Sequence, residues 1–269
     1  MSELSVFGLA RQVLETASPR AKVAAARQVA QTWREGAATL GAAVEPPSRP
    51  ARPAAPEHVP PGQVPRRRLS SQAGRTALLH AIAHIEFNAI DLAFDMVARF
   101  GTDALIGEKE RRDFVSDWIG VGEDEARHFT LLADRLESLG SVYGALPAHG
   151  GLWDAAEATA GSLPARLAVA PLVLEARGLD VTPGMIDRLE SADDRESAEI
   201  LRVIYEEEVG HVAAGMRWFQ HVCDQLDQEP AGHFRTLVRR YYKGTLKPPF
   251  NIEARLKAKL TIDFYGGLS

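Results

Sequence analysis

Two Glu-x-x-His pairs, each set in a long stretch with helical periodicity, constrain this chain more than any other feature of its sequence. In the first stretch the spacing is 3, 4, 3 and 4 residues between Trp118, Val121, Glu125, His128 and Leu132. That spacing is typical of the buried stripe of an amphipathic helix, so it places a glutamate and a histidine in the interior. Burying an unpaired carboxylate costs on the order of several kcal/mol, so both side chains need partners.

The same pattern recurs further along the chain. A second Glu-x-x-His pair lies on a stripe formed by Ile200, Ile204, Glu208, His211, Gly215 and Trp218. Two other helical stretches each place a single glutamate on or beside the buried stripe, Glu86 in one and Glu175 in the other. The sequence therefore predicts four helices that carry acidic and imidazole side chains into one interior.

Two divalent metal ions would satisfy this set of side chains directly. Four carboxylates balance the charge of two divalent cations, and the i, i+3 spacing lets the Glu and His of one pair reach the same ion. This arrangement is that of di-iron carboxylate sites in helical bundles, and mixed oxygen and nitrogen ligands favour iron or manganese over magnesium or calcium. The predicted cofactor is two transition-metal ions, Fe/Fe with Mn/Fe as the alternative. The predicted metal ligands are Glu86, Glu125, His128, Glu175, Glu208 and His211.

The periodicity predicts an all-α fold, a four-helix bundle with additional N-terminal helices and a C-terminal extension. The predicted helices span residues 3–16, 20–34, 71–100, 109–139, 152–160, 164–177, 194–223 and 231–242. Pro171 is expected to bend the helix in which it lies. Gly178 is expected to end that helix, and Thr182-Pro183 to begin another short one.

Proline content marks a boundary within the chain. Eight of the sixteen prolines fall between Pro46 and Pro65, which predicts an extended connector that forms neither a helix nor a core strand. The predicted organisation is an N-terminal helical extension over 1–44, a proline-rich connector over 45–68, the di-metal bundle over 69–225, and a C-terminal helix and tail over 226–269.

Other polar residues near the predicted ligands have simpler interpretations. His80 and His84 are expected to hydrogen-bond near the core rather than to bind metal. Tyr205 is expected to be a packed tyrosine with a satisfied hydroxyl, with a redox-active tyrosine as the alternative. Asp91 and Asp95 are alternative hydrogen-bond acceptors for a ligand histidine.

Charge and cysteine content indicate the compartment. The net charge is −5, which gives no electrostatic footprint for nucleic acid or for an anionic membrane surface. The chain has one cysteine, Cys223, so it forms no intrachain disulfide and has no thiolate metal site. The N-terminus lacks the basic start and apolar block of a secretory signal, and no uncharged run reaches the ~18 residues of a membrane span. The expected localisation is cytoplasmic, with no membrane partner.

Several segments together resemble a known family. They are HAIAHIEFNAIDLAFD (80–95), DWIGVGEDEARHFTLLADRLESLGSVYGALPAHGGLW (117–153), LEARGLDVTPGMI (174–186), EEVGHVAAGMRWF (207–219) and PPFNIEARLKA (248–258). The chain resembles a bacterial family of ferritin-like proteins of unknown function, similar in layout to the tRNA-hydroxylase branch of di-iron carboxylate proteins. The resemblance implies a ferritin-like bundle and the same six ligands, and it supplies no substrate.

The leading functional hypothesis is an O2- or peroxide-activating oxidoreductase. Its substrate would be a small molecule or an RNA base. Its electrons would come from an external reductase, because a chain with one cysteine has no cysteine motif for an electron relay of its own. The Gly140–Gly151 segment and the C-terminal tail are candidate walls of a substrate pocket. The alternatives are a non-catalytic iron store with ferroxidase activity and a structural bundle with an idle metal site. The sequence leaves the oligomeric state open, a homodimer included.

Overall fold

The computed structural model describes residues 4–65 and 68–268 and confirms the all-α prediction. The chain forms two compact units, Met1–Trp153 and Asp154–Ser269. Arg66 and Arg67, which the predicted connector includes, lie outside the described residues. Besides helices, the described residues contain one pair of two-residue parallel strands, β1 (Leu4–Ser5) and β2 (Ala38–Thr39).

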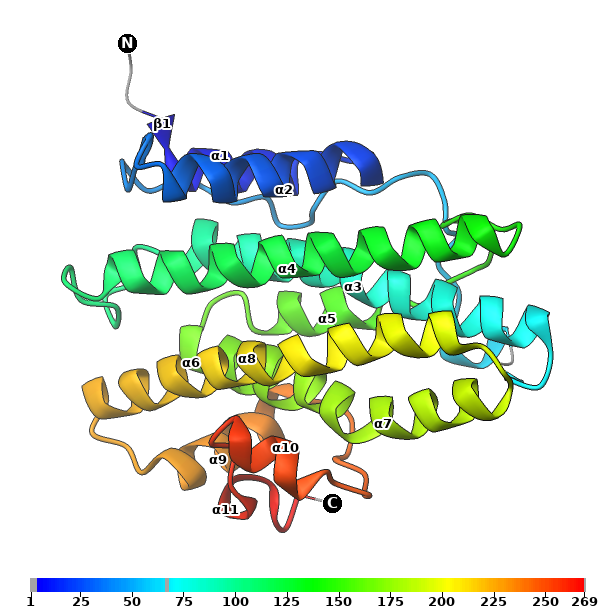
Figure 1. The fold of residues 1–269 in the computed structure, drawn as a ribbon. Helices are drawn as coiled ribbons and strands as arrows, with labels where there is room; N and C mark the ends of the chain where they lie inside the picture. Colours follow the sequence, from blue (N-terminus) through cyan, green and yellow to red (C-terminus); the bar gives the residue numbers. More distant parts are fainter. Residues whose placement is uncertain (1–3, 66–67, 269) are drawn as a thin grey trace. The chain divides into compact units, whose positions relative to one another are not determined.

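The first unit is built on two long helices, which two shorter helices cover. The long ones are α3 (Gln72–Phe100) and α4 (Arg111–Ser138), and they pack against each other. Two N-terminal helices, α1 (Val6–Leu14) and α2 (Pro19–Arg34), lie along them, α1 against α3 and α2 against α4 (Figure 1). Serine side chains begin three of these helices by accepting a backbone N–H, as N-caps do: Ser5, Ser18 and Ser71.

Helix α3 is the buried core of this unit. Among the described residues it is the one helix that is long and apolar enough to cross a membrane, with a mean hydropathy of 1.3 in its best window. However, 89% of that window is buried inside the protein, as for the central helix of a globular core. The carboxylates and imidazoles on α3 are therefore held inside the protein.

Gly122 lets α4 approach α3 closely one turn before Glu125. A Cβ atom placed at Gly122 would lie 2.7 Å from Cε2 of the Phe94 ring, which is closer than packed carbons allow. A Cβ atom at Gly120, on the same helix, would meet nothing within 4 Å. The glycine at position 122 therefore sets the spacing between the two helices.

We expect Gly122→Ala to be less stable than Gly120→Ala by about 1–3 kcal/mol in chemical unfolding, because only the former overpacks the α3/α4 contact. Both variants gain the same helix propensity, about 0.5–1 kcal/mol, so the comparison isolates the steric effect. Equal unfolding midpoints for the two variants would contradict the close approach.

The proline-rich connector belongs to the first unit and packs against the rest of it. Its backbone is fixed by hydrogen bonds from Ala51 N to Leu14 O at 2.8 Å and from Val59 N to Ala148 O at 2.9 Å. The Arg99 guanidinium on α3 donates to Pro47 O at 2.9 Å. As predicted, the described part of the connector forms no α-helix, although a three-residue 3-10 helix, η1 (Pro61–Gln63), was not expected.

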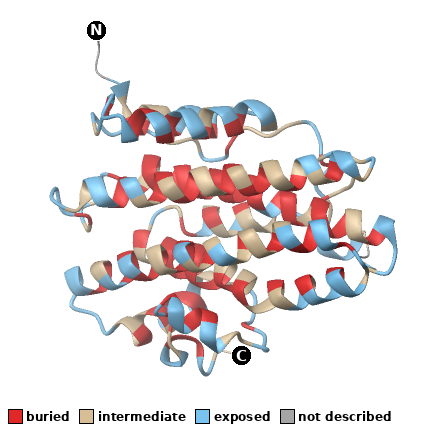
Figure 2. Ribbon diagram, viewed as in Figure 1, coloured by how far each residue is buried: buried red, intermediate tan, exposed pale blue. Residues whose placement is uncertain are grey.

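The second unit contains the other long helices. Helix α5 (Gly151–Ala158) spans the boundary between the units along the chain. After it come α6 (Leu163–Val169), the π-helix η2 (Ala170–Glu175), α7 (Ala176–Ser191), α8 (Arg195–Gln225), α9 (Pro230–Tyr241), α10 (Ile252–Lys257) and α11 (Ile262–Tyr265). Helices α7 and α8 pack against each other as a hairpin (Figure 1). Both α4 and α8 carry buried residues on one side and exposed or half-buried ones on the other (Figure 2).

The predicted break at Gly178 and Thr182-Pro183 was wrong. Helix α7 continues through both positions to Ser191, with Pro183 inside it. Pro183 has no N–H for the carbonyl of Leu179, but the Asn251 side chain donates to that carbonyl from Nδ2 at 3.1 Å. Asn251, far along the chain, therefore supplies the donor that Pro183 cannot give to the Leu179 carbonyl, and the helix continues.

Candidate metal centre

Three predicted ligands of the first unit lie together in its interior. Glu86 comes from α3, and Glu125 and His128 come from adjacent turns of α4. We call them the α3/α4 cluster. One ligand atom from each residue can be chosen so that all lie within 4.8 Å of one another. Nδ1 of His128 is 3.2 Å from a Glu86 oxygen and 3.5 Å from a Glu125 oxygen. The two carboxylates and the imidazole nitrogen thus face one small volume.

Burial gives the α3/α4 cluster unusual electrostatics. Glu125 and His128 are fully inaccessible and Glu86 is 4% exposed. Burial, followed by the charge of Glu125, raises the pKa of Glu86 well above its ordinary range, and His128 opposes this only in part. Burial alone would lower the pKa of His128, but hydrogen bonds to Glu125 and Glu86 outweigh it and raise the pKa to about 11. The two carboxylates therefore favour a positive charge at this position.

The second Glu-x-x-His pair has the same local geometry. Nδ1 of His211 lies 3.7 Å from a Glu208 oxygen on α8, close to the 3.5 Å separation between His128 and Glu125 on α4. Both side chains are buried. Glu175 is half-buried at the end of η2, which packs against α8. We call Glu175, Glu208 and His211 the α8 group. Each unit therefore carries one Glu-x-x-His pair and one lone glutamate. In both pairs the histidine Nδ1 atom faces the glutamate of the same pair.

Comparison with known proteins identifies the family of the chain. Residues 15–266 match the model of a family described as "Protein of unknown function (DUF455)". The chain belongs to this family. It is 40% identical over 203 residues to an uncharacterized protein of Haemophilus influenzae, an alignment that covers 76% of this chain and 70% of that protein. No solved structure matches the chain.

In this DUF455 member the other histidines of α3 serve hydrogen bonding, as predicted. Nε2 of His80 accepts from the backbone N–H of Gly144 at 2.9 Å. Nδ1 of His84 lies 2.9 Å from the Tyr143 hydroxyl, and its Nε2 lies 3.2 Å from the Asn88 amide. These contacts fasten the loop after α4 to α3, next to the α3/α4 cluster.

Tyr205 and the α3 aspartates have structural partners. The Tyr205 hydroxyl accepts from Asn251 Nδ2 at 2.9 Å, which confirms the satisfied hydroxyl. Asp91 and Asp95, the alternative acceptors for a ligand histidine, both pair with cations, and a contact of either carboxylate with a histidine stays a prediction. Asp95 binds Arg99 at 2.8 Å, and Asp91 binds the fully buried Lys22 and also Arg52, at 3.0 Å.

The buried Lys22 is a residue that sequence reasoning missed. It lies on α2 in the stripe Lys22, Ala26, Val29 and Trp33, all of them buried. The 4, 3 and 4 spacing was a usable signal, since a lysine on such a stripe needs an acidic partner. Its contact with Asp91 ties α2 to the same helix that carries Glu86.

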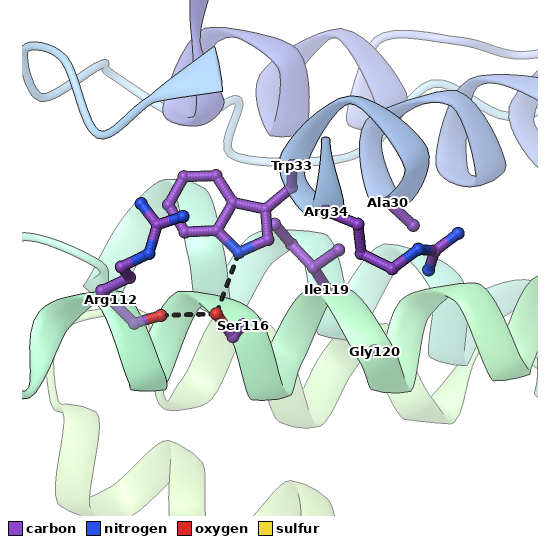
Figure 3. A pocket seen from close by; sticks show the side chains of 7 residues that line it. All are labelled: Ala30, Trp33, Arg34, Arg112, Ser116, Ile119 and Gly120. Atoms are coloured by element: carbon purple, nitrogen blue, oxygen red, sulfur yellow. Dashed lines mark hydrogen bonds between the residues drawn. The ribbon is translucent and has the colours of Figure 1, made fainter. Parts of the chain in front are cut away.

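A surface recess of about 260 Å³ lies between α2 and α4 (Figure 3). The indole N–H of Trp33 donates to Ser116 Oγ at 2.9 Å within it, and the Arg112 guanidinium lies 4.4 Å from the centre of the Trp33 ring. Its lining residues are Ala30, Trp33, Arg34, Arg112, Ser116, Ile119 and Gly120. They include no carboxylate or imidazole, so the recess is separate from the α3/α4 cluster. The Gly140–Gly151 segment does not line it, and the role of that segment as a pocket wall stays a prediction.

Proposed function

We propose that this protein binds two transition-metal ions and acts as an O2- or peroxide-activating oxidoreductase. The proposed metal pair is Fe/Fe, with Mn/Fe as the alternative. The α3/α4 cluster is the observation that carries the proposal. Two carboxylates buried within a few ångströms of each other repel, and a bound cation removes that cost. The carboxylate oxygens and imidazole nitrogen of this cluster suit iron or manganese.

We further propose that all six predicted ligands serve one centre in a ferritin-like four-helix bundle. The shared geometry of the two Glu-x-x-His pairs supports this, because equivalent pairs are expected to hold equivalent ions. One cluster alone carries two carboxylates, which balance one divalent ion; the six residues together carry four and balance two. The α3/α4 cluster would then hold one ion, and the α8 group the other.

The residues of the chain have defined tasks in this proposal. The glutamates supply anionic oxygen ligands, and Nδ1 of each histidine supplies a neutral nitrogen once its proton has left. Bound iron would supply one-electron chemistry toward dioxygen or peroxide. Burial of five of the six ligands, all except the half-buried Glu175, limits access of water to the centre. We propose a cytoplasmic location, a small-molecule or RNA-base substrate, and an external reductase as the electron source.

One experiment tests the reaction class. The metal-free chain is loaded anaerobically with Fe(II) and then exposed to O2 or peroxide while its absorption spectrum is recorded. The proposal predicts an oxidation faster than that of free Fe(II), with two iron ions oxidised per chain. Oxidation followed by growth of a large iron core would instead indicate an iron store. If iron binds tightly but neither O2 nor peroxide oxidises it, the site is structural and idle.

Removing metal is expected to lower the melting temperature, since a ligand that binds only the folded state stabilises by about 2.7 kcal/mol at 100 times its Kd.

The metal-free protein should also lose stability as pH rises from about 5.5 to about 8.5. Glu86 and His128 both have raised pKa values in the fold, so the stability they contribute at low pH is lost as pH rises. Metal should stabilise more at the higher pH, because it binds deprotonated ligands. Thermal melts with and without chelator at the two pH values check this; identical melts would contradict it.

A further inference from the structure

The helix that carries Glu175 changes its winding just before that residue. The segments α6, η2 and α7 run without a break from Leu163 to Ser191, and the six residues from Ala170 to Glu175 form a π-helix. Pro171 is the second residue of this π-helix, where its missing N–H removes a bond of the α-helical ladder. Short π-helical segments inside α-helices are frequently found at functional sites.

Pro171 packs directly on a glycine of α8. A Cβ atom placed at Gly215 would lie 2.5 Å from Cβ and 2.6 Å from Cγ of the Pro171 ring. The proline ring is rigid, so no side-chain rotation could relieve such a contact. By contrast, a Cβ atom at Gly210 on the same helix would meet nothing within 4 Å. Gly215 is therefore the position at which α8 admits the proline.

This contact fixes the register of the two helices near the α8 group. Helices α7 and α8 pack as an antiparallel hairpin joined by the short link between Ser191 and Arg195. Glu175 follows Pro171 by four residues, about one turn, and His211 precedes Gly215 by four residues. Because the helices run in opposite directions, a contact between Pro171 and Gly215 brings Glu175 to the level of His211.

We infer that Pro171 and Gly215 are positioning residues that place Glu175 opposite His211 and Glu208, so that the α8 group can hold its ion. The inference rests on the proposed di-metal function and adds two residues that bind no metal themselves. Ligand distances in metal sites are set to within about 0.2 Å, so a shift of one helix against the other is enough to weaken binding.

The test is an anaerobic Fe(II) titration of four metal-free chains: the parent, Gly210→Ala, Gly215→Ala and the size swap Gly215→Ala/Pro171→Gly. The parent and Gly210→Ala are expected to bind two ions with equal affinity. Gly215→Ala should keep one ion and bind the other about 10–100-fold more weakly, as when a group that orients a ligand is lost. The size swap should recover most of that loss, because it returns the space that the added methyl group takes.

The outcomes separate this inference from the proposed centre. A parent chain that binds no iron would refute the centre and the inference together. Two ions at parent affinity in Gly215→Ala would overturn the inference alone, as would a folded size swap that binds as weakly as Gly215→Ala. If Gly215→Ala fails to fold, Pro171→Gly replaces it. With glycine at both positions nothing fills the contact between the two helices, so the second ion should again bind more weakly, and unchanged binding would overturn the inference.

Discussion

Replacing Asp180 with Ala is expected to lower the free energy of unfolding of the second unit by about 3–5 kcal/mol, because it leaves a buried guanidinium without its counter-ion. Arg255 is 2% exposed and binds both oxygens of the Asp180 side chain, which is inaccessible to solvent, at 2.8 and 2.7 Å. An arginine cannot escape the cost by losing its proton. The guanidinium also stacks on Tyr265 at 4.5 Å, so the pair fastens the C-terminal tail to α7.

The matched control is Glu190→Ala, which removes one acidic partner of Arg202 at the surface and leaves Glu199 as another. Exposed ion pairs contribute about 0–1 kcal/mol, so this variant should unfold nearly as the parent does. Urea unfolding compares the midpoints, and limited proteolysis reports whether the tail after Lys247 is released. A midpoint for Asp180→Ala equal to that of Glu190→Ala would show that the buried pair does not hold the tail.

Glu125→Gln is expected to weaken binding of at least one metal ion by more than about 100-fold, since losing even a group that orients a ligand costs 10–100-fold. The side chain keeps its volume, and the charge of Glu125, which adds to the effect of burial in raising the pKa of Glu86, disappears. The metal-free variant should therefore melt at or above the temperature of the metal-free parent. Low metal content combined with a stable fold is the expected result.

A neighbouring glutamate supplies the control for this variant. Glu123 lies on the same helix but is only partly buried and pairs with Arg34 at the surface. Glu123→Gln should bind two ions as the parent does. If Glu125→Gln also binds two ions at parent affinity, Glu125 is a buried acid that metal does not need, and the α3/α4 cluster loses its assigned role.

The long helices were predictable because their periodicity is uninterrupted. The expected ranges 71–100, 109–139 and 194–223 correspond to α3, α4 and α8 with ends that differ by two residues or fewer. In α4 and α8 the apolar residues recur every three or four positions over many turns, so the buried stripe is defined by local spacing. Helix α3 is instead apolar and buried on nearly all sides. The same local rule places the Glu and His of each pair on one helix face.

Features that depend on distant partners were not predictable in this way. The break expected near Pro183 failed because Asn251, 72 residues away from Leu179, satisfies the carbonyl that the proline leaves open. The ion pairs of Asp91 depend on Lys22 and Arg52, which come from a helix and a connector that precede α3. The π-helix that ends at Glu175 contains Pro171, which packs against Gly215 of α8, a residue 44 positions away. The union of six ligands in one centre, and the division into segments 1–44, 45–68, 69–225 and 226–269, stay predictions.

The number of metal ions that the chain binds tests the central claim most directly. Metal-free parent and Glu208→Gln are titrated anaerobically with Fe(II), and the bound ions per chain are counted at saturation. The account predicts two tightly bound ions for the parent and one for Glu208→Gln, because the α8 group would lose a ligand while the α3/α4 cluster keeps its own. A parent that binds no ion, or a Glu208→Gln variant that still binds two ions as tightly as the parent, would contradict it.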